Sequence, residues 1–267
     1  MCRVSDSRCV IFVVLPLAPA VMLLAAAAER RLGPSAAGWV AALPVAFAVA
    51  ATGVDLGSGG RAAATMALSA AGHVPAQIAF ASSFAAVLRR LGLLRGVVAG
   101  TASYALVSLL VGGLGPVERV VAAVVALFIG PRLICRARPA SVTVGDGRPL
   151  PVVMSCASAA LVVAMAMLAT SLAGPAAAGT IAAFPTMSAA LASVVGRRRG
   201  RQAAIDALYG LTRSLPCYFA FCLVVGLVAP TTPLPASIAV ALATSIVTAS
   251  FTWRAIPTPG RPLAHAA

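Results

Sequence analysis

Long apolar stretches dominate this chain, and short polar or Gly/Pro-rich turns separate them. A helix that spans a bilayer needs about 20 mostly apolar residues. Nine stretches approach or meet this length, and they cover residues 9–28, 34–54, 62–88, 94–114, 117–135, 151–172, 175–195, 203–229 and 234–253. The pattern predicts an all-α, polytopic membrane protein of about nine transmembrane helices.

Two of these stretches leave an alternative open. Residues 9–28 follow two arginines and end in a run of alanines, which also fits a cleaved signal peptide. In 117–135, only twelve residues separate Arg119 from Arg132. They make about 18 Å of helix, against a hydrocarbon core of about 30 Å. Without this span, the chain would have eight spans and two parallel repeats.

The composition excludes an ordinary soluble enzyme. Hydrophobic residues make up 61% of the 267 residues, and charged residues only 10%. Soluble domains carry about 25% charged residues. The same apolar content excludes a disordered chain.

The net charge of +14 gives an orientation, because all twenty cationic residues are arginines and they cluster between apolar stretches. We therefore expect no nucleic-acid partner. Nine spans place Arg3, Arg8, Arg61 and Arg119 on one side. The other side holds Arg30, Arg31, Arg89, Arg90, Arg95, Arg132, Arg136, Arg138, Arg148, Arg197, Arg198, Arg199, Arg201, Arg254 and Arg261. Because positively charged loops stay cytoplasmic, we predict a bacterial inner-membrane protein with its N-terminus outside and its C-terminus in the cytoplasm.

The two halves of the chain repeat each other at a constant offset, which aligns Gly33 with Gly174. From Gly33 to Phe80, 17 of 48 positions are identical to 174–221 without gaps, including the pairs Pro44/Pro185 and Pro75/Pro216. One extra span between two four-span units inverts the second unit. The pattern predicts two inverted four-helix repeats (1–114 and 151–254), a linking helix with a cytoplasmic loop (115–150) and a tail (255–267). Inverted repeats are a recurrent transporter plan.

The second half carries a family resemblance. Ala178-Gly179, Phe184-Pro185-Thr186, the Arg201 turn, Gly210, and Pro216 with Tyr218-Phe219 resemble the GlpM family of small bacterial inner-membrane proteins. The resemblance covers roughly 151–256, and the first half matches only through the repeat. It implies two GlpM-like units in one chain. It implies a fold more than a function, although the family name is associated with alginate production.

The prolines and polar stripes are the candidate substrate-binding residues. Pro44 and Pro185 lie about ten residues into their helices, where proline frees backbone carbonyls. Broken helices at equivalent depth often form substrate sites, although such a proline also serves as a structural kink. Polar residues recur every four positions along one helix face in Thr65, Ser69, His73 and Gln77, with Asp206, Ser214 and Tyr218 at equivalent positions. The stripes fit a hydrated path or hydrogen bonding between helices.

Arg213 and His73 are the ionisable residues of greatest interest. Arg213 lies deep in its span, where an arginine is costly and usually functional or paired. Asp206 is seven residues away, about 10 Å along the helix, so a direct pair with Arg213 needs a bend or a water. His73 fits a proton carrier or a packed histidine.

The remaining sequence signals are negative. The chain has no catalytic triad, paired carboxylates or phosphate loop, and its six cysteines form no metal-ligand pattern, so we expect no enzyme activity, cofactor or metal. The sequence favours a transporter or channel for an unidentified small molecule or ion in the lipid bilayer. The alternative is a non-transporting subunit that supports polysaccharide or lipid assembly in the envelope, with a homodimer or an envelope protein as partner.

Overall fold

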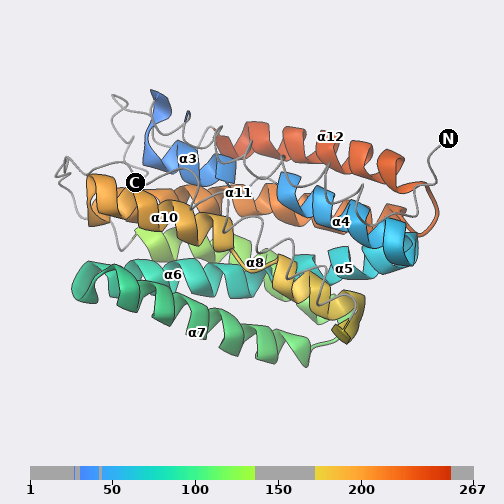
Figure 1. Cartoon of the computed structure of the whole chain (residues 1–267), viewed down its shortest axis with the longest axis horizontal. Coiled ribbons are helices and arrows are strands. Elements are labelled where there is room, and N and C mark those ends of the chain that lie inside the picture. The colour runs from blue at the N-terminus through green and yellow to red at the C-terminus, as the bar shows by residue number, and fades with distance from the viewer. Residues whose placement is uncertain (1–26, 28–30, 42–43, 136–171, 254–267) are drawn as a thin grey trace.

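The computed structural model describes residue 27 and residues 31–41, 44–135 and 172–253, and over these residues it is helical without strands. The helices are α3 (Pro34–Ala41), α4 (Val45–Ser58), α5 (Gly60–Gly72), α6 (Val74–Leu91), α7 (Leu93–Gly112), α8 (Pro116–Cys135), helix 172–182 (Leu172–Ala182), α10 (Thr186–Arg199), α11 (Arg201–Val228) and α12 (Leu234–Trp253) (Figure 1). The predicted stretches 9–28 and 151–172, the loop before Leu150 and the tail lie outside the described residues, except for residues 27 and 172.

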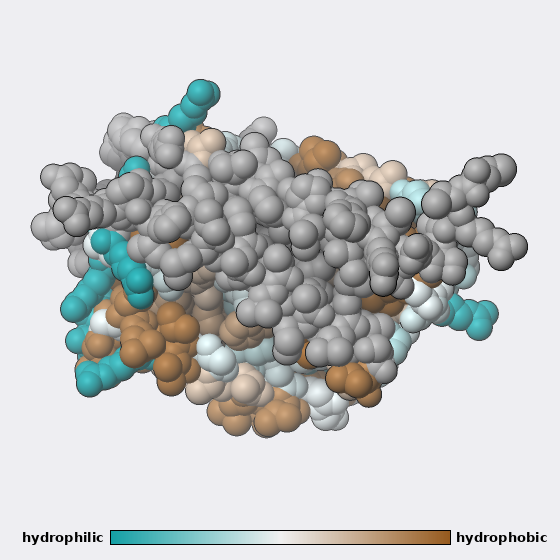
Figure 2. Space-filling view, in the orientation of Figure 1, coloured by the Kyte–Doolittle hydropathy of each residue, from teal (hydrophilic) through white to brown (hydrophobic). Residues whose placement is uncertain are grey.

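The described helices have the lengths and surfaces of a membrane protein. Among them α7, α11 and α12 are long and apolar enough to cross a bilayer, and the bent pair of α5 and α6 would make a fourth span. Leu94, Leu109 and Ile246 are each more than two-thirds exposed. Figure 2 shows hydrophobic surface along the lower edge of the view, where α7 lies. A soluble monomer rarely exposes large apolar patches, so lipid is the natural solvent for these side chains.

The helix boundaries recur at the offset of the sequence repeat. Both ends of α4 align with the ends of α10, and both ends of α7 align with the ends of α12. The turn glycines follow the same rule. Gly33 and Gly174 have φ of 93° and 83°, and Gly59 and Gly200 have φ of 82° and 89°. This left-handed backbone favours glycine, so the spacing of the glycines positions the turns.

The equivalent long helices run in opposite directions. The Arg201 guanidinium, at the start of α11, donates to the carbonyl of Arg89, near the end of α6, at 3.3 Å. At the other end, a Cβ on Gly60, the first residue of α5, would lie 2.9 Å from the carbonyl oxygen of Ala229. α11 therefore crosses the α5/α6 pair antiparallel, although α11 is the counterpart of that pair.

Each half places its first described helix against the long helix of the other half. α3 packs on α11 so closely that a Cβ at Gly38 would overlap the carbonyl of Ala207. Helix 172–182 packs equally closely on α5, where a Cβ at Gly179 would overlap the carbonyl of Met66. Residues 38 and 179 are counterparts, and so are residues 66 and 207. The two contacts therefore join equivalent positions of the alignment, with the roles of the two halves exchanged.

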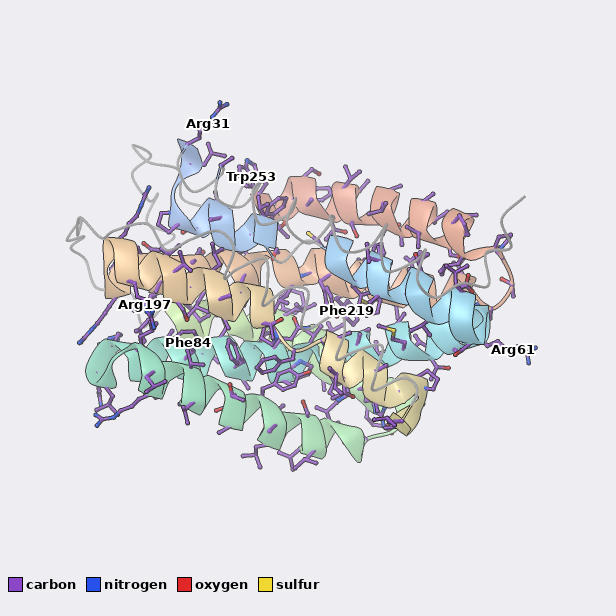
Figure 3. All side chains as sticks on the ribbon, viewed as in Figure 1. Arg31, Arg61, Phe84, Arg197, Phe219 and Trp253 are labelled. Atoms are coloured by element: carbon purple, nitrogen blue, oxygen red, sulfur yellow. The ribbon has the colours of Figure 1, made fainter. Side chains whose placement is uncertain are left out.

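Arginines gather at one end of the bundle. The side chains of Arg31 and Arg197 lie at the left of Figure 3, and Arg61 lies at the right. The bond between Arg201 and the Arg89 carbonyl places the 89–95 turn beside the 197–201 turn. The two most arginine-rich described turns of the two halves therefore share one end.

The fifth predicted stretch forms α8, a helix of 20 residues that packs on α5, α6 and α11. Arg119, in its first turn, donates from Nε to the Leu114 carbonyl at 2.9 Å and from Nη2 to the Gly112 carbonyl at 2.8 Å. The last carbonyls of a helix lack partners within it. Arg119 therefore stabilises the end of α7.

Candidate functional site

Three helix breaks interrupt predicted membrane spans among the described residues. α3 ends at Ala41 and α4 begins after Pro44, and helix 172–182 ends before Pro185, which precedes α10. Both prolines are buried. Helices end at these prolines as their positions predict, because proline has no N–H and its ring blocks the preceding carbonyls.

The third break divides the stretch 62–88, which the sequence alone predicts as one helix. α5 ends at Gly72, α6 begins at Val74, and the two bend by 42° at His73. Pro75 lies in the first turn of α6 and cannot donate to the carbonyl of Ala71. Its counterpart, Pro216, lies inside α11, which continues without a break. The stretch 62–88 is therefore two helices rather than one, and the bent pair remains a candidate for a single membrane span.

A buried polar cluster lies at the His73 break. We define it as Ser69, His73, Gln77, Tyr104, Thr180 and Tyr218. His73 is 3% exposed, and its Nδ1 lies 2.7 Å from the Ser69 carbonyl. Its Nε2 lies 3.3 Å from the Thr180 hydroxyl, in the second half of the chain. Ser69 Oγ donates to the Ala176 carbonyl at 2.7 Å, so two side chains of the first half bond to helix 172–182.

Tyr104 satisfies a carbonyl that the break at Pro185 frees. The Phe184 N–H bonds to Ile181, and the next residue is a proline, so the Thr180 carbonyl lacks its usual helical partner. The Tyr104 hydroxyl of α7 donates to this carbonyl at 2.6 Å. Neither Tyr104 nor Thr180 is part of the predicted stripes. The only sequence signal for Tyr104 is an isolated tyrosine in an apolar helix.

Tyr218 differs from Tyr104 in the hydrogen bonding of its hydroxyl. The Tyr218 side chain is 7% exposed and lies beside Gln77 and Cys222, yet its hydroxyl has no partner at hydrogen-bonding geometry among the described residues. Buried hydroxyls are usually bonded. A buried, unpaired hydroxyl that faces a polar cluster is therefore a candidate ligand-binding group.

The Tyr104→Phe variant is expected to lose about 1 kcal/mol of unfolding free energy, because the half-buried Thr180 carbonyl loses its hydrogen bond. Tyr218→Phe makes the same chemical change at a hydroxyl without a partner, and should cost far less. Unfolding curves of both variants in one detergent measure the difference. Equal losses would contradict the role assigned to Tyr104.

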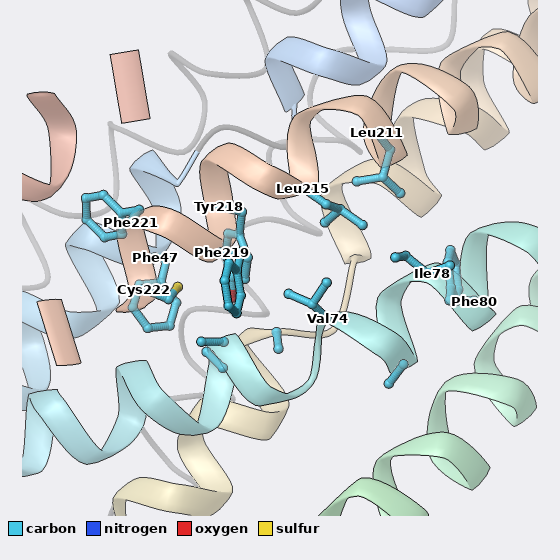
Figure 4. Close-up of a cluster of buried hydrophobic side chains, with 14 of the residues drawn as sticks. Phe47, Val74, Ile78, Phe80, Leu211, Leu215, Tyr218, Phe219, Phe221 and Cys222 are labelled. Atoms are coloured by element: carbon cyan, nitrogen blue, oxygen red, sulfur yellow. The ribbon is translucent and has the colours of Figure 1, made fainter. Parts of the chain in front are cut away.

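Aromatic side chains enclose the polar cluster. Phe184 packs edge-on against Tyr104 at 5.0 Å and Phe80 at 5.6 Å between ring centroids. Phe47 packs edge-on against Tyr218 at 5.8 Å. Figure 4 shows Tyr218 and Phe219 of α11 facing the α5/α6 break, where Val74 lies. No carboxylate is buried among the described residues, so this centre is polar but carries no fixed negative charge.

The other predicted residues lie apart from the polar cluster. Thr65 is exposed, and its hydroxyl donates to the Arg61 carbonyl within its own helix. Ser214 is buried and donates to the Leu211 carbonyl. The Gln202 amide bonds to Asp206 at 3.2 Å. Arg213 donates to the Tyr209 hydroxyl at 3.0 Å and lies over its ring, which gives this half-buried cation a polar partner and a cation–π contact.

The described residues contain no group of three or more metal ligands, and Cys217 and Cys222 are free thiols. Comparison of the chain with known protein families, curated proteins and solved structures gives no match. The class of the protein therefore follows from its own structure. It is a helical membrane protein with a buried polar cluster at broken helices.

Proposed function

We propose that this protein is an integral inner-membrane transporter or channel for a small solute, with its path between two inverted repeats of four helices. In this arrangement nine helices cross the membrane, and the unit is an internal duplication of a GlpM-like protein. The observation that carries the proposal is the polar cluster, because it joins a broken helix of one half to a broken helix of the other.

Inverted repeats are supported by the antiparallel crossing of α11 with α5 and α6, and by the exchanged contacts of Gly38 and Gly179. A two-fold axis that relates antiparallel helices is perpendicular to them, so it lies in the plane of the membrane if the helices span it. Transporters with this symmetry hold their substrates near the midplane, at discontinuous helices between the repeats.

The arginine-rich end supports the predicted orientation. The 89–95 and 197–201 turns meet at this end, as nine spans require, whereas eight spans would separate them across the membrane. This end then faces the cytoplasm. The N-terminus lies outside and the C-terminus inside in this arrangement.

The test is flux into liposomes that hold the purified full-length chain, measured over a panel of ions, amines and organic anions. His73→Ala and Gln77→Ala should lower the flux of a transported solute at least about tenfold, because each removes a buried polar group that a solute in the path would meet. Arg213→Ala, which removes the half-buried cation of α11, should also alter the flux.

Thr65→Val is the matched control, because Thr65 belongs to the same stripe but is exposed and bonded within its own helix. Its flux should equal that of the unmodified protein. No flux over the whole panel would overturn the proposal. A stable envelope-protein partner, captured in gentle detergent and unaffected by changes at His73 and Arg213, would then support the subunit hypothesis.

A further inference from the structure

We propose that His73 is a proton-binding site through which transport is coupled to protons, and that the Thr180 hydroxyl is the partner of the ring in both protonation states. The coupling rests on the proposed function, whereas proton binding at His73 does not.

The hydrogen bonds of His73 fix which ring nitrogen is free. Nδ1 lies 2.7 Å from the Ser69 carbonyl oxygen, and a carbonyl only accepts, so Nδ1 carries a proton in either state of the ring. The neutral ring therefore has its lone pair on Nε2. This nitrogen faces Thr180 Oγ1 at 3.3 Å, across the boundary between the halves.

Thr180 is able to serve both states because its hydroxyl has two partners. Oγ1 lies 3.3 Å from Nε2 of His73 and 3.3 Å from the Ala176 carbonyl. With the neutral ring, the hydroxyl donates to Nε2. When a proton from water binds Nε2, the new N–H donates to Oγ1, and the hydroxyl proton turns to the Ala176 carbonyl. One proton is gained, the ring becomes a cation, and no backbone atom needs to move.

The turned hydroxyl shares the Ala176 carbonyl with two other donors, the Thr180 N–H of helix 172–182 and Ser69 Oγ. This carbonyl accepts from Ser69 Oγ at 2.7 Å and from Thr180 Oγ1 at 3.3 Å. Ser69 Oγ lies 3.5 Å from Thr180 Oγ1. A buried histidine whose hydrogen bonds served only the neutral ring would lose one on protonation. His73 keeps both.

The ionisable neighbours of His73 come from three helices. Arg119 of α8 packs its side chain on Gly72 and acts electrostatically on the ring. Tyr104 of α7 bonds to the Thr180 carbonyl, and α11 brings Tyr218 and Cys222 to the far side of Gln77. None of these groups is a carboxylate. The cationic ring is therefore not held by an ion pair in the cluster, which lets the proton leave.

Nitrogen NMR of the full chain, labelled at histidine, tests proton binding directly. The sequence has only two histidines, and His265→Gln leaves the signal of His73 alone. The neutral ring should carry its proton on Nδ1, and Nε2 should become protonated between about pH 8 and pH 5. A proton on Nε2 of the neutral ring, or no change over this range, would overturn the proposal.

Thr180→Val and Thr180→Ser distinguish the effect of the Thr180 hydroxyl from the effect of its side-chain shape. Valine keeps the shape but removes the hydroxyl that bonds Nε2 in both states. Because the hydrogen bond of the cationic ring is the stronger of the two, the proton affinity of His73 should fall at least about tenfold. Serine keeps the hydroxyl, and the affinity should stay within about threefold. Equal titrations of the two variants would overturn the role of Thr180.

A pH gradient across liposomes tests the coupling separately. Solute flux that drives movement of protons, reported by a trapped pH-sensitive dye and lost in His73→Gln, supports it. Solute flux without proton movement would overturn the coupling and leave the proposed transport intact. Proton binding by NMR without flux of any solute would overturn the transport and leave the proton site intact.

Discussion

The Gly38→Val variant is expected to accumulate no folded protein in the membrane. A Cβ at this position would overlap the carbonyl of Ala207 in α11. The obstacle is main chain within a long helix, so no side chain is able to turn aside. Overpacking costs typically 1–3 kcal/mol even where neighbours adjust. Here α3 would have to leave α11 altogether.

Gly179→Val should fail in the same way, because the counterpart Gly179 meets the carbonyl of Met66. Gly112→Val is the matched control, since a Cβ there meets nothing within 4 Å and the residue lies at the end of α7. Detergent extraction followed by size-exclusion chromatography measures the folded fraction. Normal yields of the two buried variants would contradict the close packing of α3 on α11 and of helix 172–182 on α5.

Cysteine labelling in intact cells should place the 89–95 and 197–201 turns on the same, cytoplasmic side. In a chain without its native cysteines, Arg90→Cys and Arg197→Cys should react with a membrane-impermeant reagent only after permeabilisation. Both positions are exposed. Arg197 lies at the arginine-rich end in Figure 3, and the Arg89 carbonyl, next to Arg90, is bonded to Arg201 there. Because arginine-rich turns resist translocation, we expect a nearly complete difference.

The matched controls lie at the opposite end of the bundle. Ser58 and Thr231 are exposed next to Gly60 and Ala229, which approach each other there. Ser58→Cys and Thr231→Cys should therefore react in intact cells. Reaction of Arg90→Cys and Arg197→Cys on opposite sides would instead favour eight spans with parallel repeats.

Much of the fold is predictable from the sequence, because the residue patterns that determine helices and their ends are local. The length of each apolar stretch predicts helices, and helices form at 34–54 and 175–195 with breaks at Pro44 and Pro185. The offset between the two repeats, found mainly from glycines and prolines, also relates the helix boundaries. These residues restrict the backbone wherever they stand, so their effect needs no tertiary context.

The sequence alone predicts only part of the polar cluster. Ser69, His73, Gln77 and Tyr218 follow from the four-residue spacing, but Thr65 in the same stripe is exposed. Helical periodicity identifies the residues that share one face of a helix. It does not show which of these residues other helices bury. Thr180 and Tyr104 belong to other helices, and only the crossing of helices from the two halves brings them to His73.

The sequence by itself determined a helical membrane protein, its arginine distribution and its repeat, because hydrophobicity, charge and backbone restriction act residue by residue. Only the tertiary structure decided that α5 and α6 bend at His73, whereas α11 stays continuous through the equivalent Pro216. It also decided which hydroxyl faces the histidine ring. Both outcomes depend on contacts between residues far apart in the chain, such as Thr180 with His73, and no local pattern encodes such a contact.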